Sequence, residues 1–406
     1  MKKFLIVGAN LDNKGAESML FIAVDEIKKR FPTAEVYYAG LDIFDSEKYA
    51  FSFIYYSFAA KKIALGEKVA VNVIKSNVKD IIKAIVGKRN NLWQANSVKN
   101  LFAELSAVID VSGFNLGEKW DISTQEGYLD NIRLAKKYNV PIYLMPQSFG
   151  PFNYTDEKKY LLDEIKELLR YPAKIYAREE AGKKALEETF GLSNVSLSTD
   201  LVLQNKSVDP QNIYNRVGEI NLPEITSDGN VAIIPNKQCF NFGNKDKLLS
   251  LYDSIIRELL NVGKTVYIFR HSVEDLPICK MIKEMFRDEK NVMLIERDFT
   301  CLEYDEYIKN FDFIICSRFH GIVHAYRNSI PSIALGWAVK YKELAEKVNQ
   351  GKYAVDITEP EGLSDEVMSI LSDMLQNYRV NSKTIFESVK NIQKDNCFDI
   401  LDELGE

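Results

Sequence analysis

Short apolar and β-branched runs alternate with amphipathic stretches along most of the chain. The short runs predict buried strands, and apolar positions repeating every three or four residues predict helices that cover them. This alternation is typical of parallel sheets with helices on both faces, so the predicted fold class is α/β. In the first half, the runs that predict strands are Phe4–Gly8, Val36–Ala39, Ala107–Val111, Pro141–Met145, Lys174–Ala177 and Val195–Ser198.

The alternation is interrupted between Asn205 and Asn230, where the chain becomes polar and irregular, with prolines and glycines. Such a stretch predicts a domain junction. Beyond it, strands are predicted at Val231–Pro235, Thr265–Phe269, Val292–Ile295, Asp312–Cys316 and Ser332–Gly336. We therefore expect two doubly wound domains, residues 1–205 and 228–361, that face a cleft, followed by a helical segment over residues 362–406.

An insertion at about residues 51–104 is predicted to be helical and basic. Within it, the segment Lys61–Arg89 has eight basic residues and two acidic ones, although the whole chain carries a net charge of −6. Isoleucines and valines interleave with the lysines at helical spacing, which predicts an amphipathic surface. This surface either packs its apolar stripe on the core, as in an ordinary helix pair, or faces anionic lipid or an acidic polymer.

Composition excludes several classes of protein. The 406 residues are 46% hydrophobic and 27% charged, which provides for the cores of two or three domains and excludes a disordered chain. The acidic net charge argues against general nucleic-acid binding. The five cysteines are widely spaced without a C-x-x-C pair, as expected of reduced thiols. Because no signal or spanning segment is recognisable, we expect a soluble, cytoplasmic protein.

The densest cluster of chemically reactive side chains follows the predicted strand Asp312–Cys316. Arg318 and His320 stand where that strand turns into a helix, and the next strand is followed by Lys340. Neighbouring parallel strands end at the same edge of a sheet, so these three side chains are expected to surround a phosphate or carboxylate. In the alternative interpretation, Arg318 pairs with a local carboxylate, His320 caps the helix and Lys340 is solvated.

The three histidines raise the question of a metal site. His320 and His324 have the i, i+4 spacing that can hold a metal, but no acidic residue lies between them. We therefore expect His324 to be an interior histidine and predict no metal site. His271 follows another strand, where it either lines the cleft or bonds Glu274 or Asp275.

Polar turns also follow the predicted strands of the first domain. The turn after the first strand does not read G-x-G-x-x-G, so a dinucleotide site is poorly supported. The turns at 112–115 and 146–151 have short side chains and backbone N–H groups that suit hydroxyl-rich or anionic ligands. Arg178 either reaches the cleft or pairs with neighbouring glutamates. Asp200 is expected to cap or orient a loop.

These turns, in this order, resemble the polysaccharide pyruvyl transferase family from Phe4 to about Val348. The resemblance implies two Rossmann-like domains in a GT-B-like arrangement. It also implies an enzyme that moves pyruvate from phosphoenolpyruvate onto two hydroxyls of a sugar as a ketal, without a metal or other cofactor. The most specific motifs are Asn13-x-Gly15-Ala16-Glu17, Gln147-Ser148-Phe149-Gly150-Pro151, Arg178-Glu179, Thr199-Asp200, Arg318-x-His320 and the Lys340 that follows Gly336.

The resemblance also implies roles for individual residues. Phosphoenolpyruvate carries a carboxylate and a phosphate, and Arg178 and Lys340 would hold these anions. The reaction needs protonation at C3, attack of a hydroxyl at C2 and departure of phosphate, so His320 would act as acid or base. Arg318 would orient His320 or add charge. The residues that would face the sugar acceptor are Asn13, Glu17, Ser112, Asn115, Gln147 and Ser148.

The chain departs from the family pattern in two places. Ser112-Gly113-Phe114-Asn115 stands where many relatives have a Gly-rich run, and Pro235-Asn236-Lys237 lacks an arginine. Two alternative functions therefore remain open: a GT-B-type glycosyltransferase that uses a nucleotide sugar, and a glycan- or anion-binding protein without catalysis. If the acceptor is a lipid-linked glycan precursor, Lys61–Arg89 would make a peripheral membrane contact.

Overall fold

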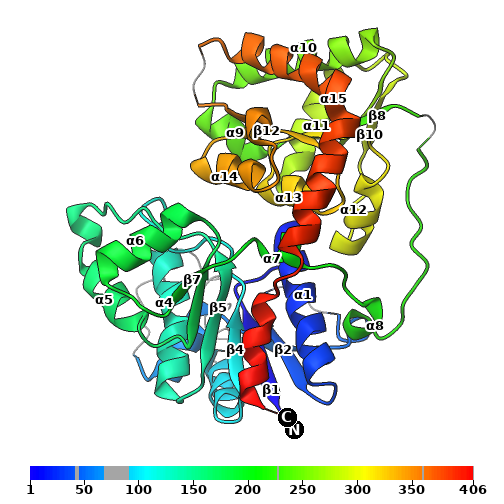
Figure 1. Ribbon diagram of the computed structural model, residues 1–406. Helices are drawn as coiled ribbons and strands as arrows, with labels where there is room; N and C mark the ends of the chain where they lie inside the picture. Colours follow the sequence, from blue (N-terminus) through cyan, green and yellow to red (C-terminus); the bar gives the residue numbers. More distant parts are fainter. Residues whose placement is uncertain (42–44, 68–90, 226–227, 359–360, 406) are drawn as a thin grey trace, which may run out of the picture.

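The computed structural model of the chain describes residues 1–41, 45–67, 91–225, 228–358 and 361–405. It has two parallel sheets, each flanked by helices, that are connected by an irregular segment and by the last long helix (Figure 1). All cysteines are buried and unpaired. Among the described helices, none is both long and apolar enough to cross a membrane.

The N-terminal sheet has seven parallel strands with β1 and β4 at its centre. Phe4 of β1 lies opposite Val36 on one side and Ala107 on the other. The strand order reverses between β1 and β4, which is where doubly wound sheets place their ligand crevice. In spatial order the strands are β3 (Ser52–Tyr55), β2 (Glu35–Gly40), β1 (Lys3–Val7), β4 (Ala107–Asp110), β5 (Ile142–Gln147), β6 (Lys174–Ala177) and β7 (Val195–Leu197).

The C-terminal sheet has six parallel strands and reverses its order between β8 and β11. Ile233 of β8 lies opposite Ile268 on one side and Ile315 on the other, and all three are buried. In spatial order the strands are β10 (Val292–Ile295), β9 (Thr265–Phe269), β8 (Asn230–Ile234), β11 (Phe313–Cys316), β12 (Ser332–Gly336) and β13 (Ala354–Asp356).

Helices cover both faces of each sheet, as the alternating pattern predicts (Figure 1). The longer helices of the N-terminal half are α1 (Lys14–Arg30), α2 (Phe58–Leu65), α4 (Ile122–Lys137), α5 (Tyr160–Leu168) and α6 (Glu180–Phe190), and two short ones, α7 (Leu201–Gln204) and α8 (Pro210–Ile213), precede the linker. Those of the C-terminal half are α9 (Lys237–Phe242), α10 (Lys245–Asn261), α11 (Leu276–Met285), α12 (Cys301–Ile308), α13 (Phe319–Arg327), α14 (Val339–Lys347) and α15 (Leu363–Ile392).

The predicted strands are confirmed to within two residues, and the short edge strands β3 and β13 were missed. β3 lies in the stretch predicted to be a helical insertion, so that prediction is wrong at its start. The aromatic and β-branched residues of β3 pair with β2 and extend the sheet. Helical structure follows at α2 and at residues 91–102.

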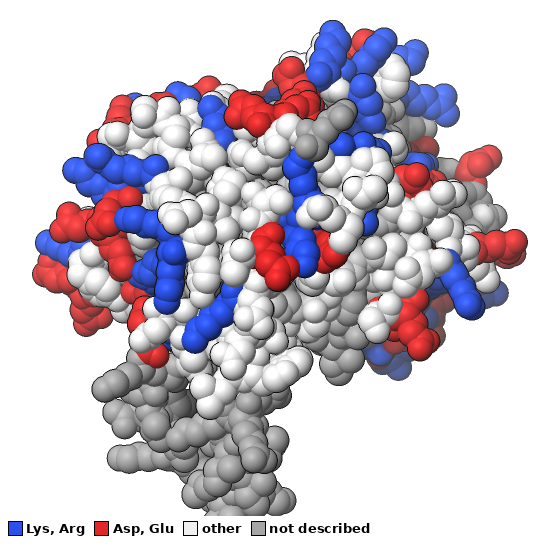
Figure 2. Space-filling model, turned by 90° about the horizontal axis from the view of Figure 1, so that it is seen from below, with Lys and Arg blue, Asp and Glu red and all other residues white. Residues whose placement is uncertain are grey.

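The basic segment Lys61–Arg89 is described only up to residue 67. Its first two lysines belong to α2, which packs on α4. Lys61 is buried, and Lys62 forms an ion pair with Asp130 at 3.0 Å, so neither lysine presents its charge to a membrane. Residues 68–89 lie outside the described residues. On the face shown in Figure 2, basic and acidic side chains are interspersed among the described residues.

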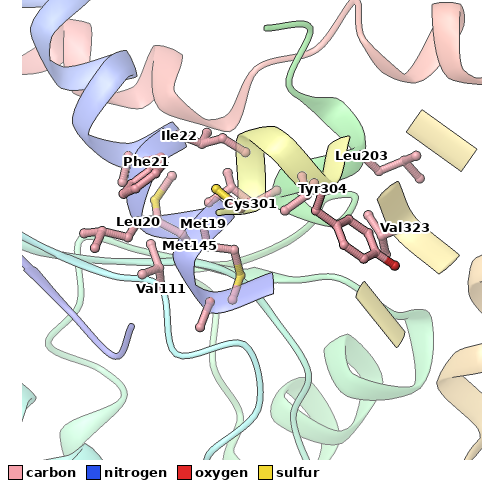
Figure 3. Packing of buried hydrophobic residues seen from close by; sticks show 14 of the residues in the cluster. Met19, Leu20, Phe21, Ile22, Val111, Met145, Leu203, Cys301, Tyr304 and Val323 are labelled. Atoms are coloured by element: carbon pink, nitrogen blue, oxygen red, sulfur yellow. The ribbon is translucent and has the colours of Figure 1, made fainter. Parts of the chain in front are cut away.

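Helix α1 is the core element shared by the two halves of the chain. Its buried side chains belong to one continuous apolar cluster that includes residues of both sheets. In Figure 3, Met19 and Ile22 of α1 lie beside Cys301 of α12, with Leu203 of α7 and Tyr304 of α12 close by. Apolar burial of this extent holds the two sheets in a fixed relation along α1.

The C-terminal segment, predicted to be helical, returns from the second sheet to the first. α15 runs downward between the halves, and the short helix η4 (Cys397–Leu404) ends next to the N-terminus (Figure 1). Arg30 of α1 donates to Asp399 at 2.6 Å and to Asp402 at 3.1 Å. The last residues of the chain therefore bind helix α1, which packs on the N-terminal sheet.

A series of buried hydrogen bonds crosses the interface between α1 and the C-terminal half. Ser18 Oγ lies 3.0 Å from Nε2 of His324, and Nδ1 of that histidine lies 2.8 Å from Oδ1 of Asp305. Burial alone would raise the pKa of Asp305, but the hydrogen bond with His324 and the charge of Arg327 lower it to about 2. The prediction that His324 is an interior histidine is confirmed.

We expect Ser18→Ala to lower the free energy of unfolding by about 1–3 kcal/mol, because it leaves Nε2 of His324 buried without a partner. Urea denaturation followed by circular dichroism measures this change. Ser254→Ala is the matched control, since that hydroxyl bonds only a backbone carbonyl on the exposed surface of α10. If the two variants were equally stable, the Ser18–His324 hydrogen bond would not stabilise the interface as we describe.

Candidate functional site

A polar pocket lies between the two halves of the chain, at the carboxyl ends of their strands. Arg178, Glu179 and Asp200 line it from the N-terminal half, where they follow β6 and β7. Its other wall is made by residues at the start of α13 and along α14: Phe319, Lys340, Glu343, Leu344 and Lys347. Doubly wound sheets commonly bind ligands at this position.

Arg178 is the best-anchored cation of the pocket. Its Nε donates to Ser148 Oγ and to Glu179 Oε1, both at 2.9 Å, and its Nη1 donates to Asp200 Oδ2 at 3.0 Å. The guanidinium lies 4.4 Å from the centre of the Phe319 ring, which comes from the other half of the chain. Arg178 is therefore held rigidly, as a planar anion-binding group needs to be.

Asp200 connects the two halves through its carboxylate. It caps α7 by accepting from Val202 N at 3.0 Å, binds Arg178, and lies 3.5 Å from His320 Nε2. Burial alone would raise the pKa of this carboxyl, but His320 and Arg178 together lower it far below the usual range. Asp200 therefore stays ionised and attracts a proton to the imidazole.

His320 sits in the first turn of α13, pressed against the start of α1. A Cβ added to Gly15 would fall 2.2 Å from Cγ of the imidazole, so only glycine fits beneath the ring. Burial lowers the pKa of His320, and the nearby Asp200 opposes this shift. The ring is thus neutral near pH 7 and able to accept a proton. Within the described ranges, no group of three His, Cys, Asp or Glu residues is placed to hold a metal.

Lys340 is a cation without a carboxylate partner among the described residues. Its Nζ lies between aromatic rings, 5.1 Å from the centre of Phe319, 5.4 Å from Trp337 and 5.5 Å from Phe114. Desolvation, followed by repulsion from Arg178, lowers the pKa of Lys340 to about 7. An anion entering the pocket would find this ammonium group unpaired.

The pocket is closed in this structure. Its free volume is about 10 Å³, which leaves no room for an organic substrate. Lys347 of α14 closes one side by donating to the backbone carbonyls of Arg178 and Ser198, the latter at 3.4 Å. Lys340 and Phe319 close another side. Binding of a substrate here therefore requires α14 and the N-terminal half to separate.

Arg318 does not join this cluster, so of its two expected roles, adding charge and orienting His320, the structure agrees only with the second. Its guanidinium turns away and donates to Asp275 through Nε at 2.8 Å and Nη2 at 2.6 Å, and to Glu274 at 2.6 Å. Asp275 also accepts from Lys237 N and Ser272 N. This is the alternative in which Arg318 pairs with carboxylates, although the partners are 43 and 44 residues away in the sequence. These ion pairs anchor the turn that precedes His320.

The predicted acceptor residues separate into four groups. Ser148 belongs to the anion pocket through Arg178, whereas Ser112 and Asn115 line a second cavity in the N-terminal half. Gln147 is buried and donates to Met145 O.

Asn13 and Glu17, which were predicted to face the acceptor, lie at the interface between the halves. Asn13 caps α1 through Gly15 N and Ala16 N. Glu17 accepts from Cys301 N at 2.9 Å, and burial raises its pKa to about 7.

Several contributors to the pocket were not predicted from the sequence, among them Lys347, Glu343 and Leu344 of α14. Asp200 was interpreted only as a loop cap, although its place after β7, in line with Arg178 after β6, was a usable signal. Phe319 and Phe114 carry no sequence signal of a site, because their contacts with cations arise only when the two halves meet. His271 is buried against Tyr304, away from the pocket, and bonds neither Glu274 nor Asp275.

The chain is similar to known proteins in sequence and in fold. The family model described as polysaccharide pyruvyl transferase matches residues 13–338. A search of curated proteins gave no match.

Among solved structures, UDP-GlcNAc 2-epimerase from Neisseria meningitidis, bound to UDP-GlcNAc, is 15% identical with a TM-score of 0.54, covering 100% of this chain and 99% of that one. Spinosyn rhamnosyltransferase is 12% identical with a TM-score of 0.53, covering 100% of both chains. UDP-GlcNAc 2-epimerase from Methanocaldococcus jannaschii is 13% identical with a TM-score of 0.51, covering 97% and 100%. These likenesses show the fold: two Rossmann-like domains in the GT-B arrangement, as predicted.

We expect Gly15→Ala to destabilise the protein by about 1–3 kcal/mol, because the added methyl group overlaps the His320 ring and must displace it or α1. Chemical denaturation measures the loss. Gly218→Ala is the control, since a Cβ there meets no atom within 4 Å. A Gly15→Ala variant as stable as the control would show that the imidazole does not pack against α1 as described.

Proposed function

The chain belongs to the polysaccharide pyruvyl transferase family, and from this premise we propose that it transfers pyruvate from phosphoenolpyruvate to a sugar as a ketal. The acceptor is a sugar of a polysaccharide or of a lipid-linked glycan precursor. The observation that carries the proposal is the interdomain pocket, where Arg178 and the unpaired Lys340 stand beside His320 and Asp200. A donor with two anionic groups matches two cations held at one site.

The two cations have different parts in holding the donor. Arg178 uses Nε and Nη1 for protein partners, and its Nη2 has no partner in the described part of the chain, so a planar N–H group is left for a carboxylate or phosphate. Lys340 contributes a point charge from the opposite wall. Clamping one anion from each half would draw the two halves together around phosphoenolpyruvate.

The proton balance of the reaction fits a single neutral histidine. C3 of phosphoenolpyruvate gains one proton, and two sugar hydroxyls bond to C2 in turn while the C2–O bond to phosphate breaks. Of the two hydroxyl protons released, one balances the proton gained by C3 and the other leaves with phosphate. Neutral His320 takes a hydroxyl proton, and Asp200 stabilises the imidazolium until it passes that proton on.

We expect His320→Ala to lower kcat for acceptor-dependent phosphate release from phosphoenolpyruvate by about 10²- to 10⁴-fold, with a small effect on KM. Lys340→Ala should instead raise KM for phosphoenolpyruvate. A coupled phosphate assay with a panel of glycan acceptors, checked by mass spectrometry of the product, measures both. Lys342→Ala is the control, because that lysine is exposed on the same helix.

Thermal stability with ligands tests the donor before any acceptor is known, since a ligand bound only by the native state raises the melting point. Phosphoenolpyruvate should stabilise the wild type and not Lys340→Ala. Stabilisation by UDP alone would reject phosphoenolpyruvate as donor and favour a glycosyltransferase.

The affinity for phosphoenolpyruvate should fall as the pH rises through about 7, because Lys340 then loses its charge. The sign follows from linkage: bound anion stabilises the ammonium form, so binding takes up a proton above this pKa and weakens by up to about tenfold per pH unit. The donor's phosphate, with a pKa of about 6, changes in the opposite direction. The Lys340→Arg variant keeps its charge over this pH range, so comparison with it separates the titration of Lys340 from that of the donor phosphate. Calorimetry measures the dissociation constant of phosphoenolpyruvate for the wild type and for Lys340→Arg at each pH. If the ratio of the two constants does not change with pH, Lys340 is not the titrating group that binds the donor.

A further inference from the structure

The C-terminal half of α15 presents a stripe of basic side chains to solvent. Its members follow one another every three or four positions, so they lie on one face of the helix. They are Arg379, Lys383, Phe386, Lys390 and, in the turn after the helix, Lys394. All five are exposed, and α15 lies on the near side of the molecule in Figure 1. With the rise of an α-helix, this basic stripe is about 22 Å long.

The charge of the basic stripe is not neutralised by its surroundings. Residues 379–394 contain four cations and one acid, Glu387, so their net charge is +3 in a chain of −6. Among the described residues, none of the four cations has a carboxylate within ion-pair distance, and Lys394 donates to the amide oxygen of Asn391 at 2.9 Å. Cations on other helices do have such partners, for example Lys183 of α6 with Glu187 at 2.8 Å.

The helix macrodipole explains only one of these cations. A dipole favours cations at the carboxyl end of a helix, and its effect falls off within the last turn. Lys390 stands in the last turn of α15, whereas Lys383 and Arg379 lie 9 and 13 residues before the end of the helix at Ile392. The first half of the same helix, residues 363–378, has three acids and no cation. The cations before the last turn therefore point to an anionic partner of the helix.

Two apolar side chains stand within this basic surface. Phe386 is 53% exposed, and Val380, one turn before Lys383, is 63% exposed. Single exposed apolar residues are common, but an exposed aromatic ring among unpaired cations on one helix face is typical of helices that bind an anionic bilayer. There the cations approach lipid phosphates and the ring enters the boundary between head groups and acyl chains. A nucleic acid would match the cations alone, and the acidic chain argues against it.

The basic stripe also lies close to the interdomain site. α15 packs against α7, which Asp200 caps, and against α13, which contains His320. Gln393, just after α15, donates to the carbonyl of Asn205 at the end of α7 at 3.3 Å. A bilayer bound to the outer face of α15 would thus be separated from α7 and α13 by one helix diameter, about 10 Å.

We propose that the basic stripe of α15 binds the surface of an anionic lipid bilayer, with Lys383, Phe386 and Lys390 as its main contacts. This inference goes beyond the proposed function and does not depend on it, since lipid binding needs neither donor nor acceptor. The surface is distinct from Lys61–Arg89, whose first two lysines are buried or paired within the fold.

Co-sedimentation of the full chain with lipid vesicles tests the inference. Vesicles of phosphatidylglycerol and phosphatidylcholine in equal parts should bind the protein, and vesicles of phosphatidylcholine alone should bind it far less. The double variant Lys383→Gln/Lys390→Gln should weaken binding to the anionic vesicles by about 10- to 30-fold, because each cation near such a surface is worth about fivefold. Phe386→Ser should weaken it by about two- to tenfold, because the ring no longer enters the bilayer boundary.

The matched control is Lys245→Gln/Lys247→Gln, which removes the same charge from exposed lysines of α10 and should bind as the wild type does. Circular dichroism and the melting point show whether each variant is folded, and the substituted side chains are all exposed.

Three results would overturn the inference. The wild type does not bind anionic vesicles, the double variant in α15 binds them as tightly as the control, or the control loses as much binding as the double variant. Phe386→Ser that binds as the wild type does would remove Phe386 from the contact. If the protein binds soluble polyglutamate through Lys383 and Lys390 and does not bind vesicles, the basic stripe takes an acidic polymer and the lipid assignment is wrong.

Discussion

The buried carboxylate of Asp200 is the group on which the interdomain site depends. Removing one partner of a buried ion pair typically costs about 3–5 kcal/mol, so Asp200 and Arg178 hold each other in place. The same carboxylate faces His320, which belongs to the other half of the chain. One side chain therefore sets the position of the anion-binding cation and the protonation of the imidazole, and it does so only when the halves are closed.

Two kinds of contact hold the halves together, and they differ in strength. Along α1 the contact is a continuous apolar core, reinforced by the buried hydrogen bonds of His324 and by the ion pairs of Arg30. Across the pocket it consists of isolated polar and aromatic contacts from α14, through Lys340 and Lys347. For phosphoenolpyruvate to enter this pocket, the weaker contacts on the α14 side would have to break, while the apolar core along α1 keeps the halves together.

The sequence predicts the strands and the cations at their ends, but not the partners of those cations. Hydrophobic periodicity is local, so β8 and β11 are recognisable, and so is the three-residue edge strand β7. β3 was missed because it lies in a stretch interpreted as helical, and β13 because it directly follows a 3-10 turn. Strand ends also bring Arg178 and Lys340 to one crevice. An arginine at a strand end points either into the crevice or toward a carboxylate elsewhere in the fold, and the choice depends on residues distant in the sequence. Arg318 is an example, because its partner Asp275 lies 43 residues earlier.

The turn at 112–115 brings an aromatic ring to the interdomain pocket. Phe114 places an apolar ring 5.5 Å from the ammonium of Lys340. Together with Phe319 and Trp337 it buries the lysine, and desolvation is the first cause of the lowered pKa of Lys340. Ser112 and Asn115 on the same turn line the second cavity of the N-terminal half, so a movement of this turn would change both that cavity and the surroundings of Lys340.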